Sequence, residues 1–376
     1  MQVLVLNVGS SSVRHALFRR DADGALHALA RGHVAGIDGA GVERTIAEVL
    51  GALPASPDAV AHRVAHGGDR LVAPAIVDDA VEREIAALIP LAPLHNPSNL
   101  AGIRTARARL PHAPHVAVFD TAFHARMPAH AFLYGLPRAL HEERGVRRYG
   151  FHGPSHRHMA ETAARHLGVD AAACELRVIT CHLGAGASVA AIRGGVSIDT
   201  SMGMTPLEGL VMVTRCGDLD PGVVLRLARE GLTFDAIDDL LQRRAGVAGL
   251  AGMAPDFRAI EAAADAGDPC ARLAIDVFVH RLRKYVGAYA AILGGVDVLA
   301  FAGGVGEGSA AVRAAACATL GFLGVEVDAA RNGAARPAET GGVVDVSAPG
   351  ARARVLVVHT DEERVIASEA CGVLVR

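Results

Sequence analysis

The sequence predicts an α/β fold built from two domains of the same kind. Apolar, β-branched segments alternate with helical segments along the chain, which is the pattern of strands packed against helices. A strand, a turn of small residues and a second strand open the chain at residues 2–18, and the same arrangement returns at residues 176–195. A chain of 376 residues can close two hydrophobic cores. The repeat at half the chain length therefore indicates a duplicated domain rather than a solenoid.

Four strands and two helices are expected in the first half of the chain. The strands occupy residues 2–6, 13–18, 61–67 and 115–120, and the first two are joined by the small-residue turn NVGSSS. The helices run from about residue 79 to 89 and from NPSN at residues 96–99. Each helix lies between strands in sequence, as an α/β domain requires.

The second half repeats this order with longer helices. Strand 176–183 leads into GAGAS at residues 184–188, and a helix begins at Asp220-Pro221, where proline suits the first turn. Further elements are expected at residues 269–293 (helix), 296–304 (strand), 310–320 (helix) and 353–359 (strand). A last helix from Asp361 is too short to be a domain and is expected to return to the first one. The domains would then be residues 1–121 plus about 363–376, and residues 122–362.

Composition excludes several classes of function. The formal net charge of −3 provides no basic surplus for nucleic acid. The N-terminus lacks the basic region of a signal peptide, and the longest apolar run, residues 286–296, is too short to span a membrane. The six cysteines form no C-x-x-C pair, which is typical of a reducing compartment. These features together predict a cytoplasmic protein with no membrane partner.

Three loops of small residues follow strands: NVGSSS, GAGAS and AGGVGEGS at residues 302–309. Each could be a simple turn, but ligands of open α/β sheets bind at the ends of strands, where such loops can cradle an anion. AGGVGEGS lacks the spacing of a dinucleotide fingerprint. Lys284 is the only lysine, so a G-K-[ST] phosphate loop is also excluded. Any phosphate site must use backbone amides, hydroxyl groups, arginine or histidine.

Two acids and two arginines are placed where a site could form. Asp120 and Glu362 follow apolar strands, so their carboxylates could hold a hydrated Mg²⁺; the alternative for the TDEE segment is helix capping. Arg63 and Arg215 lie in apolar segments near glycines and either form structural ion pairs or face a cleft. A guanidinium group suits carboxylate and phosphoryl oxygens.

The segment YGFHGPSH places His152 and His156 four residues apart. A zinc site, as in a zinc hydrolase, is one interpretation, but the glutamate of H-E-x-x-H is missing. Charge stabilisation beside a transferred group is favoured for His152, because an imidazole can donate a hydrogen bond to developing negative oxygens. His156 could instead satisfy backbone or helix-end groups, since Pro154 can occupy a first helical turn.

These segments, taken in order, resemble the acetate kinase family and its short-chain acyl kinase relatives, within the sugar kinase, Hsp70 and actin superfamily. The resemblance covers nearly the whole chain and lies in LVLNVGSSS, HRVAHGG, LAPLHNPSN, VAVFDTAFHARMP, RRYGFHGPSH, CHLGAGAS, DTSMGMTPLEGLVMVTRCGDLDPG, AGGVGEGS and TDEE. It implies two ribonuclease-H-like domains with an active-site cleft between them. It also implies Mg²⁺, or Mn²⁺ in its place, with ATP and ADP as co-substrates, and a homodimer formed through the C-terminal domain.

The implied reaction is reversible, direct in-line transfer of the ATP γ-phosphoryl group to acetate, giving acetyl phosphate. Propionate or another short-chain acid is an alternative acceptor. A nucleotide-gated ATPase of the Hsp70 or actin type is a more distant alternative, since the chain has no spare length for a peptide-binding domain.

The resemblance also assigns residues by their place in these segments. The catalytic residues would be Arg63, His95, Asp120, His152 and Arg215, of which His152 and Arg215 stabilise the transition state. The acyl group would meet Arg63, Ala65, Leu94, Phe151 and Pro206, and the metal would meet Asn7, Asp120 and Glu362. The nucleotide would meet Asn7, Ser10, Ser12, Arg14, His182, Leu183, Gly184, Ala185, Gly186, Asp256, Phe257, Arg258, Gly303, Gly304, Val305 and Gly306.

Several positions depart from the family pattern. Ala185 and Gly308 replace asparagines at the nucleotide loops, and Arg14 stands where lysine is usual. Pro154, Val213 and Cys216 replace a threonine, a glycine and a serine. Ala65 takes the place of a valine, so the acyl pocket is expected to have room for one more carbon. Acceptance of propionate comparable to that of acetate follows as a hypothesis.

Overall fold

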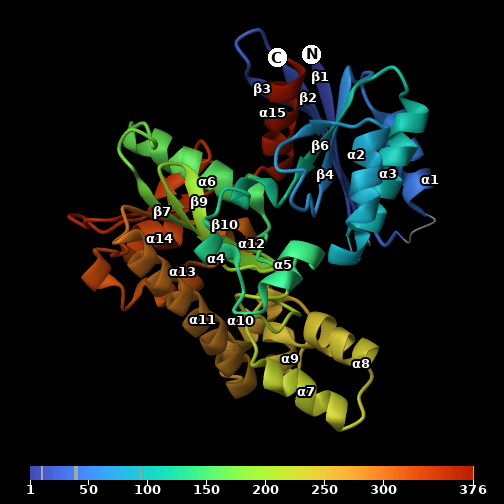
Figure 1. The fold of residues 1–376 in the computed structure, drawn as a ribbon. Helices are drawn as coiled ribbons and strands as arrows, with labels where there is room; N and C mark the ends of the chain where they lie inside the picture. Colours follow the sequence, from blue (N-terminus) through green and yellow to red (C-terminus); the bar gives the residue numbers. More distant parts are fainter. Residues whose placement is uncertain (10–11, 38–40, 94, 376) are drawn as a thin grey trace. The chain divides into compact units, whose positions relative to one another are not determined.

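The computed structural model describes residues 1–9, 12–37, 41–93 and 95–375, in two compact units. The N-terminal unit comprises Met1–Ala125, Phe151–Ser155 and Asp361–Arg376. The C-terminal unit comprises Arg126–Gly150 and His156–Thr360. Figure 1 shows that both chain ends belong to the N-terminal unit, because the last helix returns to pack against the first strand.

The N-terminal unit is a six-stranded sheet with helices on both faces. Its strands are β1 (Gln2–Val8), β2 (Ser12–Arg20), β3 (Leu26–Ala35), β4 (Ala59–Val64), β5 (Ala75–Ile76) and β6 (His115–Phe119), in the order β3-β2-β1-β4-β6-β5. The central pairs β1–β4 and β4–β6 are parallel, and the outer pairs are antiparallel. The helices are α1 (Gly41–Ala52), α2 (Asp79–Ala87), α3 (Asn96–Arg109) and α15 (Glu362–Leu374).

Strand β1 shows why both faces of this sheet are covered. Its side chains alternate, so Val3 and Val5 pack with α15 while Leu4 and Leu6 pack on the side of α1 and α3. All four side chains are at most 1% exposed. A strand buried on both faces reads as a continuous apolar run, which is how the sequence presents it.

The C-terminal unit repeats the sheet of the N-terminal unit. Its strands are β7 (Arg177–Leu183), β8 (Ala187–Arg193), β9 (Val196–Thr200), β10 (Val298–Ala302), β11 (Val343–Asp345) and β12 (Arg354–Val358), in the order β11-β12-β10-β7-β8-β9. The pairs β7–β10 and β10–β12 are parallel and the others are antiparallel. When β7 is matched to β1, every strand has its counterpart with the same direction. The predicted α/β fold with duplicated domains is confirmed.

Helices form most of the remaining C-terminal unit. They are α4 (Ala129–Phe132), α5 (Arg138–Arg144), α6 (Gly153–Leu167, whose first residues belong to the N-terminal unit), α7 (Pro221–Arg229), α8 (Phe234–Asp239), α9 (Gly246–Ala251), α10 (Phe257–Asp265), α11 (Pro269–Leu293), α12 (Gly303–Gly308), α13 (Ala310–Cys317) and α14 (Ala329–Ala334). The long helix α11 begins where Asp268 accepts hydrogen bonds from two amides and Pro269 takes the first turn. It ends at Gly294, which has φ 71°.

The expected strands and helices are present, with ends shifted by a few residues. Several elements were not expected, among them strand β3, strand β9, helix α1 and helix α10. Strand β3 is an outer strand whose side chains are partly or fully exposed, so it lacks the apolar run that marks the inner strands. Among the residues that the structure describes, no helix is both long and apolar enough to cross a membrane.

Candidate active site

The N-terminal unit brings Arg63, Asp120 and Asn7 together at the carboxyl ends of three neighbouring strands. Arg63 Nε and Nη2 donate to the two carboxylate oxygens of Asp120 at 2.9 and 2.5 Å, and Nη1 donates to Asn7 Oδ1 at 3.2 Å. Strands β1, β4 and β6 are parallel neighbours, so their last residues meet at one edge of the sheet. Arg63 is therefore a fork held in place by its partners rather than a freely moving side chain.

Charges around Arg63 keep it protonated. Burial lowers the pKa of Arg63, but the carboxylates of Asp120, Glu362 and Glu363 outweigh burial and raise this pKa above its ordinary value. The Arg63 side chain is 26% exposed and that of Asp120 only 3%, so the arginine is the more accessible partner of the pair. The ion pair that the sequence offered as one alternative for Arg63 is present, and the cleft-facing alternative stays a prediction.

His152 occupies the same edge in a strained backbone conformation. Its φ is 58°, in the left-handed region that residues other than glycine seldom adopt. The residues on either side are anchored: the Phe151 carbonyl accepts from His124 Nε2 at 3.0 Å, and the Gly153 amide donates to the Asp120 carbonyl at 2.9 Å. A side chain at Gly153 would collide with that carbonyl. Strain held in place by its surroundings is typical of functional positions.

Residues expected at the acyl group lie in both units. Ala65 follows β4, is 5% exposed, and donates its amide to Asn99 Oδ1 at 2.9 Å. Phe151 is 3% exposed and packs edge-on against His66, the neighbour of Ala65, with ring centroids 5.6 Å apart. Pro206 belongs to the C-terminal unit, and Leu94 lies outside the described residues. Two apolar groups of the predicted set thus lie near each other in the N-terminal unit.

In the TDEE segment, the residue that caps the helix and the candidate metal ligand are two different residues. Asp361 is the N-cap of α15 and accepts from the Arg364 amide at 3.1 Å. Arg31 also pairs with Asp361 at 2.6 Å. Glu362 is the first helical residue and does not cap. The capping alternative therefore applies to Asp361 and not to Glu362.

The first hairpin and the start of α3 hold the other expected residues of this unit. Gly9 and Ser12 close the hairpin through a 2.8 Å backbone hydrogen bond, and Arg14 is exposed on β2 opposite Asn7. His95 directly precedes α3 and is half-buried. Ser10 lies outside the described residues.

The C-terminal unit presents glycine turns where the N-terminal unit presents charges. The turn between β7 and β8 is closed by Gly184, which donates to the Gly186 carbonyl at 2.9 Å. Gly303, with φ 81°, lies directly on the Leu183 carbonyl and has no room for a side chain. His182 is the last residue but one of β7 and is 8% exposed. Parallel strands β7 and β10 are neighbours, so these two turns lie at the same edge.

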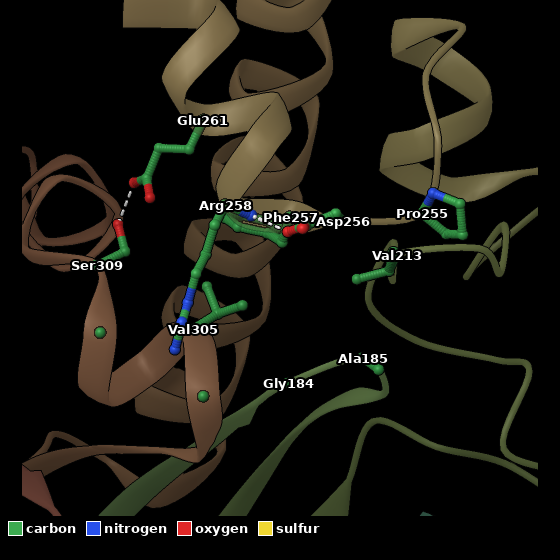
Figure 2. Close-up of a pocket in the computed structure, with 12 residues that line it drawn as sticks. Gly184, Ala185, Val213, Pro255, Asp256, Phe257, Arg258, Glu261, Val305 and Ser309 are labelled. Carbon is green, nitrogen blue, oxygen red and sulfur yellow. Dashed lines mark hydrogen bonds between the residues drawn. The ribbon is translucent and has the colours of Figure 1, made fainter. Parts of the chain in front are cut away.

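A pocket of about 590 Å³ opens beside these turns (Figure 2). It is lined by Gly184, Ala185, Val213, Pro255, Asp256, Phe257, Arg258, Glu261, Gly304, Val305, Gly308 and Ser309. This size suits a nucleoside. The lining contains most of the nucleotide-binding residues expected in this unit. The expected residues that do not line the pocket are close in sequence to residues that do: His182, Leu183, Gly186, Gly303 and Gly306.

Side chains from α10 supply most of the pocket's charge. Asp256 caps α10 through the amides of Arg258 and Ala259 at 2.9 and 3.3 Å. Glu261 accepts a short hydrogen bond from Ser309, whose hydroxyl also accepts from the Val312 amide. Figure 2 shows Arg258 extending toward Val305.

Val213, Pro255, Glu261 and Ser309 line the pocket and were not predicted to do so. Glu261 lies four residues after Phe257, on the same face of α10, so helical spacing could have found it.

Arg215 lies in an irregular segment after β9 that other side chains hold in shape. Its Nη1 donates to the Pro206 carbonyl at 3.2 Å. Asp218 closes the segment by accepting from the Gly209 amide at 2.9 Å, and Tyr285 of α11 donates to Asp218 at 2.9 Å. The segment therefore presents Arg215 and Pro206 together.

Arg148 fixes the other end of this segment and was not predicted. It donates to the carbonyls of Thr200, Ser201 and Met202 at 2.9 to 3.0 Å and to Glu208 at 2.5 Å. Burial lowers the pKa of Arg148, but Glu208 and neighbouring groups raise it overall. Its contacts join residues more than fifty positions apart, which no local pattern reveals.

His156 joins two strands of the C-terminal unit. Its Nδ1 lies 2.8 Å from the Thr180 hydroxyl and its Nε2 lies 2.8 Å from the Ser188 hydroxyl, so the imidazole bridges β7 and β8. Both partners are side-chain hydroxyl groups, and the expected contact of His156 with backbone or helix-end groups stays a prediction. Within the described ranges, no group of three or more His, Cys, Asp or Glu side chains is placed to hold a metal ion.

Comparison with known proteins places the chain in a family. Residues 42–368 match the Acetokinase family. The acetate kinase of Micrococcus luteus is 50% identical over 382 aligned positions, covering 98% of both chains. The structure of Porphyromonas gingivalis acetate kinase superposes with a TM-score of 0.89 at 40% identity, covering 99% of both chains. A propionate kinase from Francisella tularensis gives a TM-score of 0.88 at 34% identity over 98% of both chains. The chain belongs to the acetokinase family of kinases.

Proposed function

We propose that the chain transfers the γ-phosphoryl group of ATP reversibly to acetate, giving acetyl phosphate and ADP. The observation that supports this most is the Arg63 fork, fixed by Asp120 and followed two residues later by buried Ala65. A guanidinium group beside a small apolar wall suits a short carboxylic acid, whose head is charged and whose tail is not.

The acceptor needs no general base, because a carboxylate is already ionised at neutral pH. Positioning and charge compensation must therefore supply the catalysis. We assign Arg63 and His152 of the N-terminal unit and Arg215 of the C-terminal unit to the oxygens of the transferring phosphoryl group, and His95 to a supporting contact. Arg215→Ala should lower kcat by about 10³-fold. Steady-state kinetics on a variant with unchanged circular dichroism tests this assignment.

The nucleoside of ATP is assigned to the pocket between α10 and α12. Phe257, Val305 and Pro255 provide apolar walls for a base, and Arg258 provides a cation. The phosphates are assigned to the glycine turn at Gly184 and to the hairpin of the N-terminal unit. Ala185 offers no amide side chain there, so backbone amides must supply most of the hydrogen bonds.

Asn7, Asp120 and Glu362 are assigned to Mg²⁺. The side-chain oxygen of Asn7 and one carboxylate oxygen of Asp120 both accept hydrogen bonds from the Arg63 guanidinium group, at 3.2 and 2.9 Å. Two oxygen atoms that could bind a metal ion therefore lie close together in the N-terminal unit. Mg²⁺ prefers oxygen ligands, keeps several waters, and needs only one or two carboxylates, which these residues can supply. When bound, the ion would neutralise charge on the donor phosphates.

Propionate is the second acceptor that a specific residue favours. Ala65 is buried and lacks the two methyl groups of the valine expected at this position, which leaves room for another carbon. Trapping the acyl phosphate with hydroxylamine decides the function: acetate and propionate should give hydroxamate with ATP, and butyrate should give less. Absence of hydroxamate with every acid would refute the proposal.

Assembly and location are inferred separately. We expect a homodimer formed through the C-terminal unit, which light scattering on the purified protein tests. All six cysteines are free thiols, in keeping with a reducing cytoplasmic setting.

A further inference from the structure

The six-residue helix α12 forms one wall of the nucleotide pocket and is fixed from behind. Gly304, Val305 and Gly308 line the pocket. On the other side, Arg313 donates to the carbonyls of Gly306 and Glu307 at 2.9 and 2.8 Å. Arg313 is 1% exposed. The wall is therefore rigid at its carboxyl end, and its position is tied to the hydrophobic interior.

The Glu307 side chain connects α12 to the end of β12. Its Oε1 accepts from both the amide and the hydroxyl of Thr360, at 3.0 and 2.8 Å, and its Oε2 lies 2.8 Å from His359 Nδ1. The Thr360 hydroxyl in turn accepts from the Gly303 amide at 2.7 Å. Both ends of α12 are thus joined to one residue, Thr360.

Thr360 is also the last residue of the C-terminal unit. Asp361 begins the next segment of the N-terminal unit, where it is held by Arg31 at 2.6 Å and caps α15. Thr360 and Asp361 are consecutive residues whose Cα atoms stay about 3.8 Å apart, so a displacement of Thr360 moves the point from which Asp361 continues. The candidate metal ligand, Glu362, follows directly.

We propose that Glu307 is a positioning residue that couples occupancy of the nucleotide pocket to the placement of Glu362. A nucleotide bound against α12 restricts the motion of this helix. The hydrogen bonds from Thr360 to Glu307 then restrict Thr360, and the backbone from Thr360 to Glu362 restricts the metal ligand in turn. The inference deepens the proposed function, because it assumes that the pocket takes the nucleotide and that Glu362 serves the metal. It gives Glu307 a role that requires no contact with substrate.

Hydrogen–deuterium exchange with ADP as the probe tests this coupling without measuring catalysis. In the unchanged protein, ADP should slow amide exchange in the segment Val358–Glu363 about fivefold or more. Glu307→Ala should abolish that protection, while ADP still protects the turn at Gly184. A role limited to stability would speed exchange in Val358–Glu363 equally with and without ADP, which would overturn the inference.

Conservative variants separate coupling from folding. Glu307→Gln keeps the oxygen that accepts both Thr360 hydrogen bonds, and its amide can donate to His359, so it should retain the ADP effect. Thr360→Ser keeps the hydroxyl group and should do the same. Thr360→Val has nearly the shape of threonine without the hydroxyl group and should lose the effect. If Thr360→Val behaves as the unchanged protein, the inference is wrong.

Kinetics provide a second readout. Glu307→Ala and Thr360→Val should raise the nucleotide KM and the half-saturating Mg²⁺ concentration about fivefold or more and leave the acetate KM unchanged. Equal changes in all three would contradict the proposal. Glu326→Ala, an exposed carboxylate of the same unit, is the control that should change none of them.

The two failures are distinguishable. If the unchanged protein forms no acyl phosphate, the proposed function fails, whatever the exchange data show. If it forms acyl phosphate but ADP leaves exchange in Val358–Glu363 unaltered, only the coupling fails.

Discussion

The two sheets share strand order and direction but carry different chemistry at their carboxyl edges. In the N-terminal sheet, β4 ends with Arg63 near its last residue and β6 is followed by Asp120. Near the same ends of the matching strands in the C-terminal sheet, β10 leads directly into Gly303, and β12 is followed by His359 and Thr360. One edge holds a fixed charge, and the other holds glycine turns beside a pocket.

Under the proposed function, this difference would divide one reaction between two copies of the same scaffold. The sheet determines where the loops emerge, because parallel strands end at a common edge. The residues at those ends determine what each edge can bind. Charge suits the acceptor and the transferring group, and small residues let the backbone approach a nucleotide.

Replacing Arg63, which lies at the charged edge of the N-terminal sheet, should lower kcat more than any other change predicted here. Arg63→Ala removes the fork and should lower kcat by about 10³-fold or more with acetate. Arg63→Lys keeps the charge but loses the two parallel hydrogen bonds to Asp120, so its kcat should also fall strongly. Steady-state kinetics of both variants measures the loss.

Folding must be monitored in the same variants. Removing one partner of a mostly buried ion pair costs about 3–5 kcal/mol, and Asp120 would be left without its guanidinium partner. Thermal melts of Arg63→Lys provide the safer comparison. Arg104→Ala removes a 58% exposed arginine paired with Glu82 and should leave kcat unchanged. Near-normal turnover in either Arg63 variant would contradict the assigned role.

Filling the pocket beside the C-terminal sheet should weaken nucleotide binding without affecting the acceptor. At Gly304 an added Cβ would meet none of the described atoms within 4 Å, so Gly304→Leu should fold and project into the pocket. The nucleotide KM should rise about tenfold or more, since the side chain takes the place of contacts worth a few kcal/mol, whereas the acetate KM should not change. Gly333→Leu, at another uncrowded glycine on α14, is the matched control. A parallel rise in the acetate KM would argue against this division of the reaction.

Most of the fold could be predicted because its signals are local. The inner strands are buried on both faces, so they appear as apolar runs, and the small-residue turns follow them directly. The pocket segments at Gly184, Phe257 and Gly304 were likewise found as short contiguous motifs. Edge strand β3, with its exposed side chains, carried no such signal.

The supports of the site could not be predicted, because their partners are distant in sequence. Arg148 reaches Glu208, and Glu307 reaches Thr360, across 60 and 53 positions. Asp218 is held by Tyr285 in the same way. Arg148 and Asp218 lie in irregular segments and Glu307 lies in a helix of only six residues, so no helical or strand period marks them. Only the folded chain shows which of many charged residues are paired.

Acyl selectivity should sharpen the comparison within the charged edge. Ala65→Val restores two methyl groups to a buried position and should lower kcat/KM for propionate relative to acetate about tenfold, the usual worth of a methylene in an apolar pocket. The ratio of the two substrates on one preparation is the measurement, so differences in folding cancel. An unchanged ratio would mean that another residue limits the pocket.

The last prediction concerns acid sensitivity, which should belong to the N-terminal sheet. His62 and His115 stack across β4 and β6 with ring centroids 5.3 Å apart, and their nitrogens lie 2.9 Å apart. Burial lowers the pKa of both, with the charge of His115 adding to the effect on His62, and that of Arg107 adding to the effect on His115. The folded pair is therefore neutral at pH values where the unfolded chain binds protons.

Stability from this pair should be fully present above the unfolded pKa of about 6.5 and fall as pH drops below it toward the lowered folded values. The loss should be at most about 1.4 kcal/mol per pH unit for each histidine. Urea unfolding between pH 7.5 and 5.5 measures it. The double replacement His62→Leu with His115→Leu should flatten this dependence, whereas exposed His112→Gln should preserve it. If the double variant keeps the full slope, the acid sensitivity arises from other groups and the two sheets do not differ in this respect.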